Sequence, residues 1–173
     1  MYNAFTFRTS LLALTGLAAA FLTGAAHADG YRQAAVPMPK VYTQECAACH
    51  TAYPAGMLPA ASWQRIMKGL DHHYGTDASL DADSVRQIST WLTSNAATRG
   101  RTSEAPPEDR ITRSAWFVRK HDEVHPDVWK LPSVKSAANC AACHTRADRG
   151  DFDEDNIRMP AGMDSRLRRF WHD

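Results

Sequence analysis

The pentapeptide CAACH occurs at residues 46–50 and again at residues 140–144, and the two copies contain all four cysteines of the 173-residue chain. Cys-X-X-Cys-His is the pattern of covalent haem attachment. On one helical turn the two sulfurs reach the vinyl-derived carbons along one edge of a porphyrin, and the histidine lies under the ring with a nitrogen facing the iron. We therefore expect two covalently bound haem c groups, held by thioether bonds to Cys46, Cys49, Cys140 and Cys143, with His50 and His144 as proximal iron ligands.

Two other kinds of site are built from paired cysteines: disulfides in exported proteins and zinc centres. Neither explains why a histidine follows the second cysteine in both copies, or why no cysteine lies outside them. A redox-active Cys-X-X-Cys pair would also require a thioredoxin-like βαβ setting, whereas the flanking sequence reads as helix. The pattern therefore favours two haems over either alternative.

The first 28 residues have the organisation of a secretory signal peptide. Arg8 precedes an apolar run over residues 11–22, and small residues occupy the −3 and −1 positions of a cleavage site after Ala28. The run is too short to span a bilayer comfortably, and no second apolar stretch of spanning length follows it. We expect an exported, periplasmic protein whose mature chain has no membrane span.

The charge balance argues against a nucleic-acid partner. The chain has 20 Lys and Arg residues against 19 Asp and Glu residues, and cleavage removes Arg8 alone, which leaves 19 against 19. The propionates of two haems would then make the holoprotein mildly acidic. No basic excess is left to neutralise phosphates.

Helical periodicity broken by Pro and Gly predicts an all-α fold of two small cytochrome c-like haem domains with extensive loops. Haem-binding helices are expected over 41–50 and 133–144. Amphipathic helices are expected over 62–74 and from Asp81 or Ser84, the two candidate N-caps, to Ala96. Shorter helices are expected over 116–121, capped by Ser114, and over 165–171.

A linker is predicted at 98–113, because the sequence from Ala97 to Glu108 has no aromatic or branched aliphatic residue and contains two consecutive prolines. It separates an N-terminal haem domain, 29–97, from a C-terminal haem domain, 114–173. The tetrapeptide PAGM recurs after both CAACH copies, at Pro54 and Pro160. This degenerate repeat also indicates two haem modules.

Each iron in an electron carrier is expected to have a second axial ligand. On a helix over 62–74, at about 100° per residue, His73 falls beside the apolar stripe and His72 on the opposite side. His121 follows Phe117 at helical spacing among apolar neighbours, whereas His125 has charged neighbours and His172 is next to the C-terminus. We therefore predict His73 and His121 as the distal ligands.

Methionine is the alternative sixth ligand. Met57 is too close in sequence to His50 to reach the opposite haem face, and Met67 lies on the helical stripe, where packing in the core is the usual role. Met159 and Met163 stay as alternatives for the second haem.

Three segments together resemble the bacterial dihaem cytochrome c family: TAYPAGMLPAASWQRIMKGLDHHYG at 51–75, ITRSAWFVRKHDEV at 111–124 and ANCAACHTRADRGDFDED at 138–155. The resemblance implies a periplasmic, mainly helical protein with two close haem domains and bis-histidine iron. It also implies electron exchange with a small oxygen-binding monohaem cytochrome and a membrane-bound b-type cytochrome. The family's H-[FY]-G pattern falls on 73–75 and its F-V-R-K-H pattern on 117–121.

In this sequence His72 stands where the family is expected to have an acidic residue. Pairing His73 with the first haem and His121 with the second is one arrangement, and a crossed arrangement satisfies the sequence equally well.

The predicted function is outer-sphere electron transfer between redox proteins through two bis-His low-spin haems, without enzymatic turnover. The alternative is a dihaem enzyme, such as a peroxidase, or a gas sensor, which needs one open haem iron. An acidic run after the second motif offers a docking patch for a basic partner, or else is a solvated loop that pairs with nearby basic residues: Asp148, Asp151, Asp153, Glu154 and Asp155.

Overall fold

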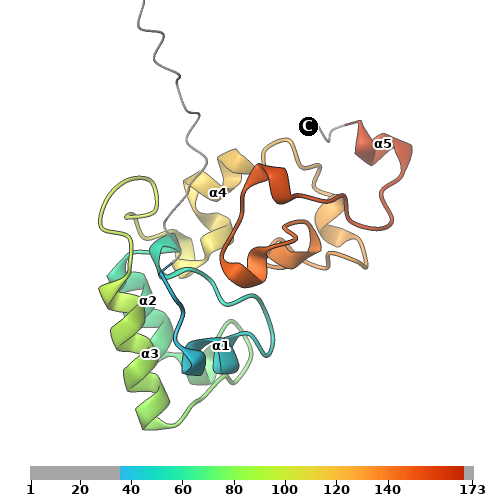
Figure 1. Ribbon diagram of the computed structural model, residues 1–173. Coiled ribbons are helices and arrows are strands. Elements are labelled where there is room, and N and C mark those ends of the chain that lie inside the picture. Colours follow the sequence, from blue (N-terminus) through green and yellow to red (C-terminus); the bar gives the residue numbers. More distant parts are fainter. Residues whose placement is uncertain (1–35, 170–173) are drawn as a thin grey trace, which may run out of the picture.

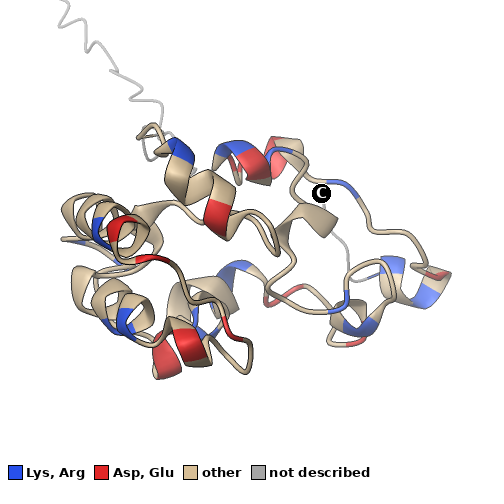
Figure 2. Ribbon diagram, turned by 90° about the horizontal axis from the view of Figure 1, so that it is seen from below, with Lys and Arg blue, Asp and Glu red and all other residues tan. Residues whose placement is uncertain are grey.

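The computed structural model describes residues 36–169, so the predicted signal peptide and His172 lie outside the described residues. Within this range the chain consists of short helices, 3-10 turns and loops, with no strand longer than an isolated bridge. This confirms the predicted all-α class. Figure 1 shows two lobes, and charged residues of both signs are spread over both (Figure 2). The α-helices are α1 (Lys40–Cys46), α2 (Ala60–Lys68), α3 (Ala82–Ser94), α4 (Ala115–Lys120) and α5 (Ser165–Arg168).

The first lobe is built around α2 and α3, which pack side by side (Figure 1). The apolar faces predicted from the sequence form its core, because Trp63 and Met67 of α2 and Ile88 and Leu92 of α3 are buried in one cluster. Of the two candidate caps, Asp81 begins α3: its carboxylate accepts hydrogen bonds from the backbone N–H groups of residues 83 and 84, at 2.9 and 3.0 Å.

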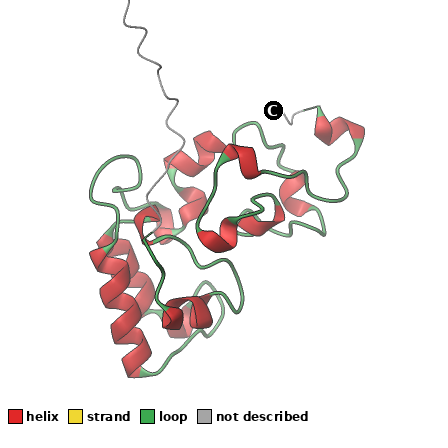
Figure 3. Cartoon of the chain, in the orientation of Figure 1, coloured by secondary structure: helices red, strands yellow, loops and turns green. Residues whose placement is uncertain are grey.

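The second lobe consists of short helical segments joined by loops (Figure 3), and most of these segments are 3-10 turns. Its buried cluster is small and contains Val128, Val134, Met163 and Leu167. Single turns follow one another around it: Val128–Lys130, Cys140–Ala142, Ala147–Arg149 and Glu154–Asn156. The buried apolar cluster of the second lobe is therefore smaller than that of the first lobe.

Several expected helices are shorter than the sequence indicates: α3 ends at Ser94 and α5 at Arg168, and three others differ more. The first haem-binding helix ends at Cys46, and the second is reduced to the 3-10 turn Cys140–Ala142. In this segment Lys135 has a positive φ of 68°, which interrupts a right-handed helix. The helix expected over 62–74 ends at Lys68 and continues, after Gly69, as the 3-10 turn Leu70–His72.

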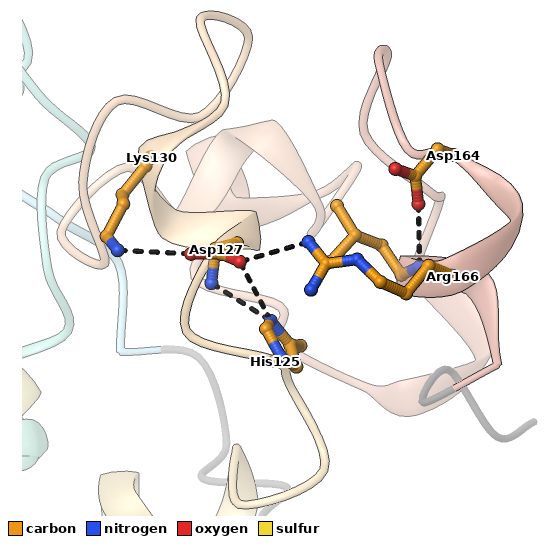
Figure 4. A network of polar contacts seen from close by, with 6 residues as sticks. His125, Asp127, Lys130, Asp164 and Arg166 are labelled. Atoms are coloured by element: carbon orange, nitrogen blue, oxygen red, sulfur yellow. Dashed lines mark hydrogen bonds and ion pairs between the residues drawn. The ribbon is translucent and has the colours of Figure 1, made fainter.

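Side-chain caps fix the helices of the second lobe. Ser114 caps α4, as predicted, because its Oγ accepts a hydrogen bond from Phe117 N at 3.2 Å. Asp164 caps α5 through Leu167 N at 2.8 Å. Figure 4 shows Asp127 between Lys130 and Arg166, with Nζ and a guanidinium nitrogen 3.0 and 3.1 Å from its two oxygens. This network ties α5 to the segment that precedes the second CAACH motif.

The segment predicted as a linker, 98–113, is attached to the first lobe. Asp109 makes a two-point ion pair with Arg65 of α2, at 2.7 and 2.8 Å. Tyr74 Oη donates to the backbone carbonyls of Glu108 and Asp109, at 3.1 and 3.2 Å, and the Arg110 guanidinium lies 4.1 Å from the centre of the Tyr74 ring. None of the helices within residues 36–169 is long and apolar enough to cross a membrane.

Candidate haem sites

The first CAACH motif begins at the last residue of α1 and turns so that His50 faces back toward the loop that follows it. His50 Nδ1 lies 2.7 Å from Thr51 O. A carbonyl oxygen only accepts hydrogen bonds, so Nδ1 carries a proton, which leaves Nε2 as the ring nitrogen that can face a metal. The ring of Tyr53 stacks on the His50 ring, with centroids 5.0 Å apart and an interplanar angle of 20°.

The ring of His73 lies opposite His50, with ring centroids 6.1 Å apart and an interplanar angle of 22°. The 3-10 turn after Gly69 carries the chain there, and Tyr74 then has a positive φ of 51°. His72 points into solvent, with a side chain 85% exposed and Nδ1 3.1 Å from the Asp71 carboxylate. The structure therefore brings His73 to His50, although the continuous helix from which this was predicted ends at Lys68.

The second CAACH motif lies opposite the end of α4. His121 follows the last residue of that helix, and its ring centroid is 6.2 Å from that of His144, with an interplanar angle of 71°. His121 Nδ1 donates to Phe117 O at 2.9 Å, and the two rings stack at 4.0 Å. His144 Nδ1 is buried without a hydrogen-bond partner in the described part of the chain, and its ring meets the edge of Phe152 at 5.4 Å.

The other candidate ligands lie in different surroundings. Met57 is buried in the first lobe, Met67 belongs to the core cluster there, and Met163 belongs to the core cluster of the second. Met159 is 46% exposed. His125 contacts Asp127 at the surface network of Figure 4. His73 thus lies against the histidine of the first CAACH motif and His121 against that of the second. This is the uncrossed of the two arrangements that the sequence allows.

Burial favours the neutral form of three of the site histidines. Loss of solvent lowers the pKa of His73, with the neighbouring His50 as a second cause. It also lowers the pKa of His121 and of His144. Neutral imidazole is the form that binds a metal, so three of the four side chains favour the ligating state.

The first thiol of each CAACH motif does not have the character of a redox-active cysteine. Burial raises the pKa of Cys46 and of Cys140 to about 11, and none of the four cysteines is in a disulfide. A redox-active Cys-X-X-Cys pair has a lowered pKa instead.

The histidine pairs fit one metal atom each. Metal–imidazole bonds of about 2.0 Å on opposite sides of one metal place the two ring centres roughly 6 Å apart, which agrees with 6.1 and 6.2 Å. The residues that would hold two haems are Cys46, Cys49, His50 and His73 in the first lobe, and Cys140, Cys143, His144 and His121 in the second.

The contacts of Tyr53 were not foreseen from the sequence. Tyr53 follows His50 by three residues, which places it near the haem, but its contact with the second lobe joins residues 85 positions apart. The stacking of Phe117 on His121 does have a sequence signal, since residues four apart on a helix share a face.

Comparison with known proteins agrees with this arrangement. The family model of dihaem cytochrome c matches residues 42–152. The chain is similar to the solved dihaem c-type cytochrome of Shewanella baltica OS155, with 38% identity and a TM-score of 0.63 over 73% of this chain and 96% of that one. It is also similar to two structures of the Rhodobacter sphaeroides protein. One has 47% identity and a TM-score of 0.59, over 68% of this chain and 99% of that one.

The other Rhodobacter structure has 45% identity and a TM-score of 0.62 over 69% of this chain and all of that one. No curated protein sequence shows significant similarity. The family match spans more than half of the chain and includes both CAACH motifs, so the chain belongs to the dihaem cytochrome c family and carries two covalently bound haem c groups, as the motifs predict.

Proposed function

We propose that this dihaem cytochrome c is an outer-sphere electron carrier rather than an enzyme, with each iron ligated by two histidines. His50 and His73 are the ligands of the first haem, and His144 and His121 those of the second. The observation that carries the proposal is the separation of the paired rings, 6.1 and 6.2 Å between centroids, because it is the spacing of two imidazoles on one metal.

The haems supply an iron that alternates between the ferric and ferrous states. With a histidine on each side, no position on the metal would be left for a substrate, so electron transfer to a partner would need no bond to iron. Two histidines also leave the reduction potential lower than a histidine and a methionine do. A low-potential, six-coordinate pair of haems suits a carrier.

The protein's part is to hold four rings in place. Hydrogen bonds from Nδ1 of His50 and of His121 to backbone carbonyls fix the tautomer and the orientation of these two rings. Stacking on Tyr53 and on Phe117 restrains the same rings further. Rings that need not reorient when the iron changes charge keep the barrier to electron transfer low.

Two haem modules, 29–97 and 114–173, are part of this proposal, and the separate buried clusters of the two lobes support it. The proposal also includes export to the periplasm, with cleavage after Ala28, and redox proteins as partners. A small monohaem c-type cytochrome and a membrane b-type cytochrome are the partners that the family resemblance implies.

The acidic run after the second motif is engaged with its own neighbours. Asp151 accepts from Asp153 N at 3.0 Å and lies 3.6 Å from Arg146, while Glu154 pairs with Lys120 of α4 at 2.9 Å. Two of its carboxylates therefore stabilise the turns and contacts of the second lobe. This favours the structural reading of the run over a docking patch.

Spectra of the oxidised holoprotein test the proposal. Electron paramagnetic resonance (EPR) combined with a redox titration should show low-spin haem only. The mass of the denatured chain should include two covalently bound haems. A high-spin fraction in the intact protein would instead favour the enzyme or gas-sensor alternative, since both need an open iron.

A further inference from the structure

The proposed distal ligand of the first haem lies in a short turn rather than in a helix. α2 ends at Lys68, and His73 follows the 3-10 turn Leu70–His72. Tyr74 then has a positive φ of 51°, and Thr76 N donates to His73 O at 3.1 Å, which closes the turn. Because no regular helix fixes residue 73, the position of its ring depends on the contacts of this turn.

The Tyr74 side chain connects the turn to residues 108–110. Its hydroxyl donates to the carbonyl oxygens of Glu108 and Asp109, at 3.1 and 3.2 Å. The Arg110 guanidinium lies 4.1 Å from the centre of its ring, a cation–π contact. The same ring meets the His73 imidazole edge-on, with centroids 4.9 Å apart. Tyr74 thus contacts both the proposed iron ligand and the segment 108–110.

An ion pair fixes the segment 108–110 against α2. The Asp109 carboxylate accepts hydrogen bonds from Arg65 Nε and from a terminal guanidinium nitrogen, at 2.8 and 2.7 Å. Such two-point pairing of arginine with a carboxylate is stronger and more directional than a single contact. The Asp109 side chain is only 14% exposed. The ion pair is therefore partly shielded from water and suited to hold the segment in place.

The backbone is strained where these residues meet. Within residues 36–169, four non-glycine residues have a positive φ, and three of them are in this contact: Tyr74, Glu108 at 57° and Asp109 at 55°. Residues other than glycine rarely adopt this conformation, and they keep it only where surrounding contacts hold them. The hydrogen bonds of Tyr74 and the ion pair of Asp109 are such contacts.

Space is available beside the His73 ring. An open cavity of about 200 Å³ is lined by His73, Tyr74, Arg65 and Asp109, among others. Close packing on this side therefore does not hold the imidazole opposite His50. The contacts that Tyr74 makes with the segment 108–110 are left to do so.

We propose that Asp109 is a positioning residue for the distal ligand of the first haem. Its ion pair with Arg65 fixes the segment 108–110, and this segment keeps His73 opposite His50 through Tyr74. The inference rests on the proposed ligation of iron by His73. Part of the segment predicted as a linker, 98–113, thereby belongs to the first haem site.

Two substitutions weaken this arrangement at different points. Asp109→Asn removes the charge of the ion pair without adding backbone strain, because asparagine tolerates a positive φ. Tyr74→Phe keeps the ring and removes the hydrogen bonds to residues 108 and 109. Asp83→Asn is the matched control, since it removes a carboxylate that pairs with Arg86 on α3 of the same lobe.

Cyanide binding to the oxidised holoprotein measures how firmly His73 is held, because cyanide reaches a six-coordinate iron only after a histidine has left it. In Asp109→Asn one haem of the two should bind cyanide about tenfold faster than in the wild type, the lower end of the effect of a hydrogen bond to a charged group. Tyr74→Phe should also accelerate binding, and Asp83→Asn should not.

A double variant shows whether Asp109 acts through His73. His73→Ala opens the first haem, so adding Asp109→Asn to it should produce no further acceleration. A merely structural role would lower the stability to urea without this dependence on residue 73.

Wild-type cyanide rates in Asp109→Asn would overturn the inference, as would an equal acceleration in Asp83→Asn or one that persists in the His73→Ala background. If Asp109→Asn fails to fold, Tyr74→Phe decides alone. The proposed function fails separately: a high-spin signal in the wild-type protein removes the bis-histidine assignment whatever these variants do. A low-spin wild type with unchanged rates in both variants removes only the positioning role.

Discussion

The imidazole rings of His50 and His73 lie nearly parallel, inclined by 22° at a centroid separation of 6.1 Å. The rings of His121 and His144 have almost the same separation, 6.2 Å, but are inclined by 71°. In a low-spin ferric haem, the angle between the two axial imidazole planes sets the splitting of the iron d orbitals. Under the proposed ligation, the two haems would therefore have the same ligands but different electronic structures.

Two distinct low-spin EPR signals are expected from the oxidised protein for this reason. The nearly parallel pair should give an ordinary rhombic signal, and the nearly perpendicular pair a signal with a much larger maximum g-value. His121→Ala should remove the second signal and leave the first. Two identical signals would mean that the angles of 22° and 71° do not persist in the holoprotein.

His73→Ala should convert one haem of the two to the high-spin state and allow it to bind carbon monoxide or cyanide, because an iron that loses its sixth ligand is open. Optical spectra with and without carbon monoxide measure this. His72→Ala is the matched control, since its side chain is 85% exposed beside Asp71, and its spectrum should equal that of the wild type. The reverse outcome would assign the ligand to His72.

The haem attachment residues could be predicted because they form a local pattern whose chemistry needs no tertiary information. The choice of His73 over His72 agrees with the burial of the two side chains, although the helix on which it was based ends at Lys68. The 3-10 turn that follows keeps residue 73 turned inward. Which histidine meets which motif is a tertiary property, and the sequence left both arrangements open.

The helix expected over 133–144 was wrong for a physical reason. Short polar side chains there compete for backbone groups: Asn139 Nδ2 donates to Val134 O at 3.0 Å, and Ser136 Oγ accepts from Ala138 N at 3.0 Å. Together with the positive φ of Lys135 they produce turns instead of a helix. The outcome of this competition depends on local backbone geometry, which the spacing of apolar residues in a sequence does not reveal.

Ser114→Ala should cost about 1–2 kcal/mol of folding stability, because it removes the N-cap of α4 and leaves Phe117 N without its acceptor. The loss should also loosen His121, whose Nδ1 bonds to Phe117 O, and increase the access of carbon monoxide to the second haem. Asp81→Ala removes the cap of α3 and serves as the control. Urea unfolding should show a similar loss there, without the change in ligand access.

Gly150→Ala should destabilise the protein more than Gly100→Ala. Both glycines have a positive φ, 71° and 78°, so an added Cβ strains the backbone in each by about 1–2 kcal/mol. Only at Gly150 does it also meet the first lobe, 3.2 Å from Pro54 Cγ, while nothing lies within 4 Å at Gly100. The difference between the two urea-unfolding free energies measures the packing between the lobes. Equal losses would show that the lobes separate to admit a methyl group.

Acid should weaken the attachment of α5 to the second lobe through Asp127. Hydrogen bonds from Lys130 and then from Arg166 lower the pKa of this carboxyl below its usual value. A lowered folded-state pKa means that the contribution to stability is present above the unfolded-state pKa and is lost as the pH falls through the folded-state value. Deuterium exchange in α5, measured relative to the intrinsic exchange rate at each pH, should therefore rise below about pH 4. In Asp127→Asn the exchange in α5 should already be raised at neutral pH, with no further rise below about pH 4.

Asp83→Asn is the control, because it removes an exposed carboxylate that is paired with Arg86 on α3. It should leave exchange in α5 unchanged. A pH response in α5 that survives Asp127→Asn would assign the acid sensitivity to another carboxyl.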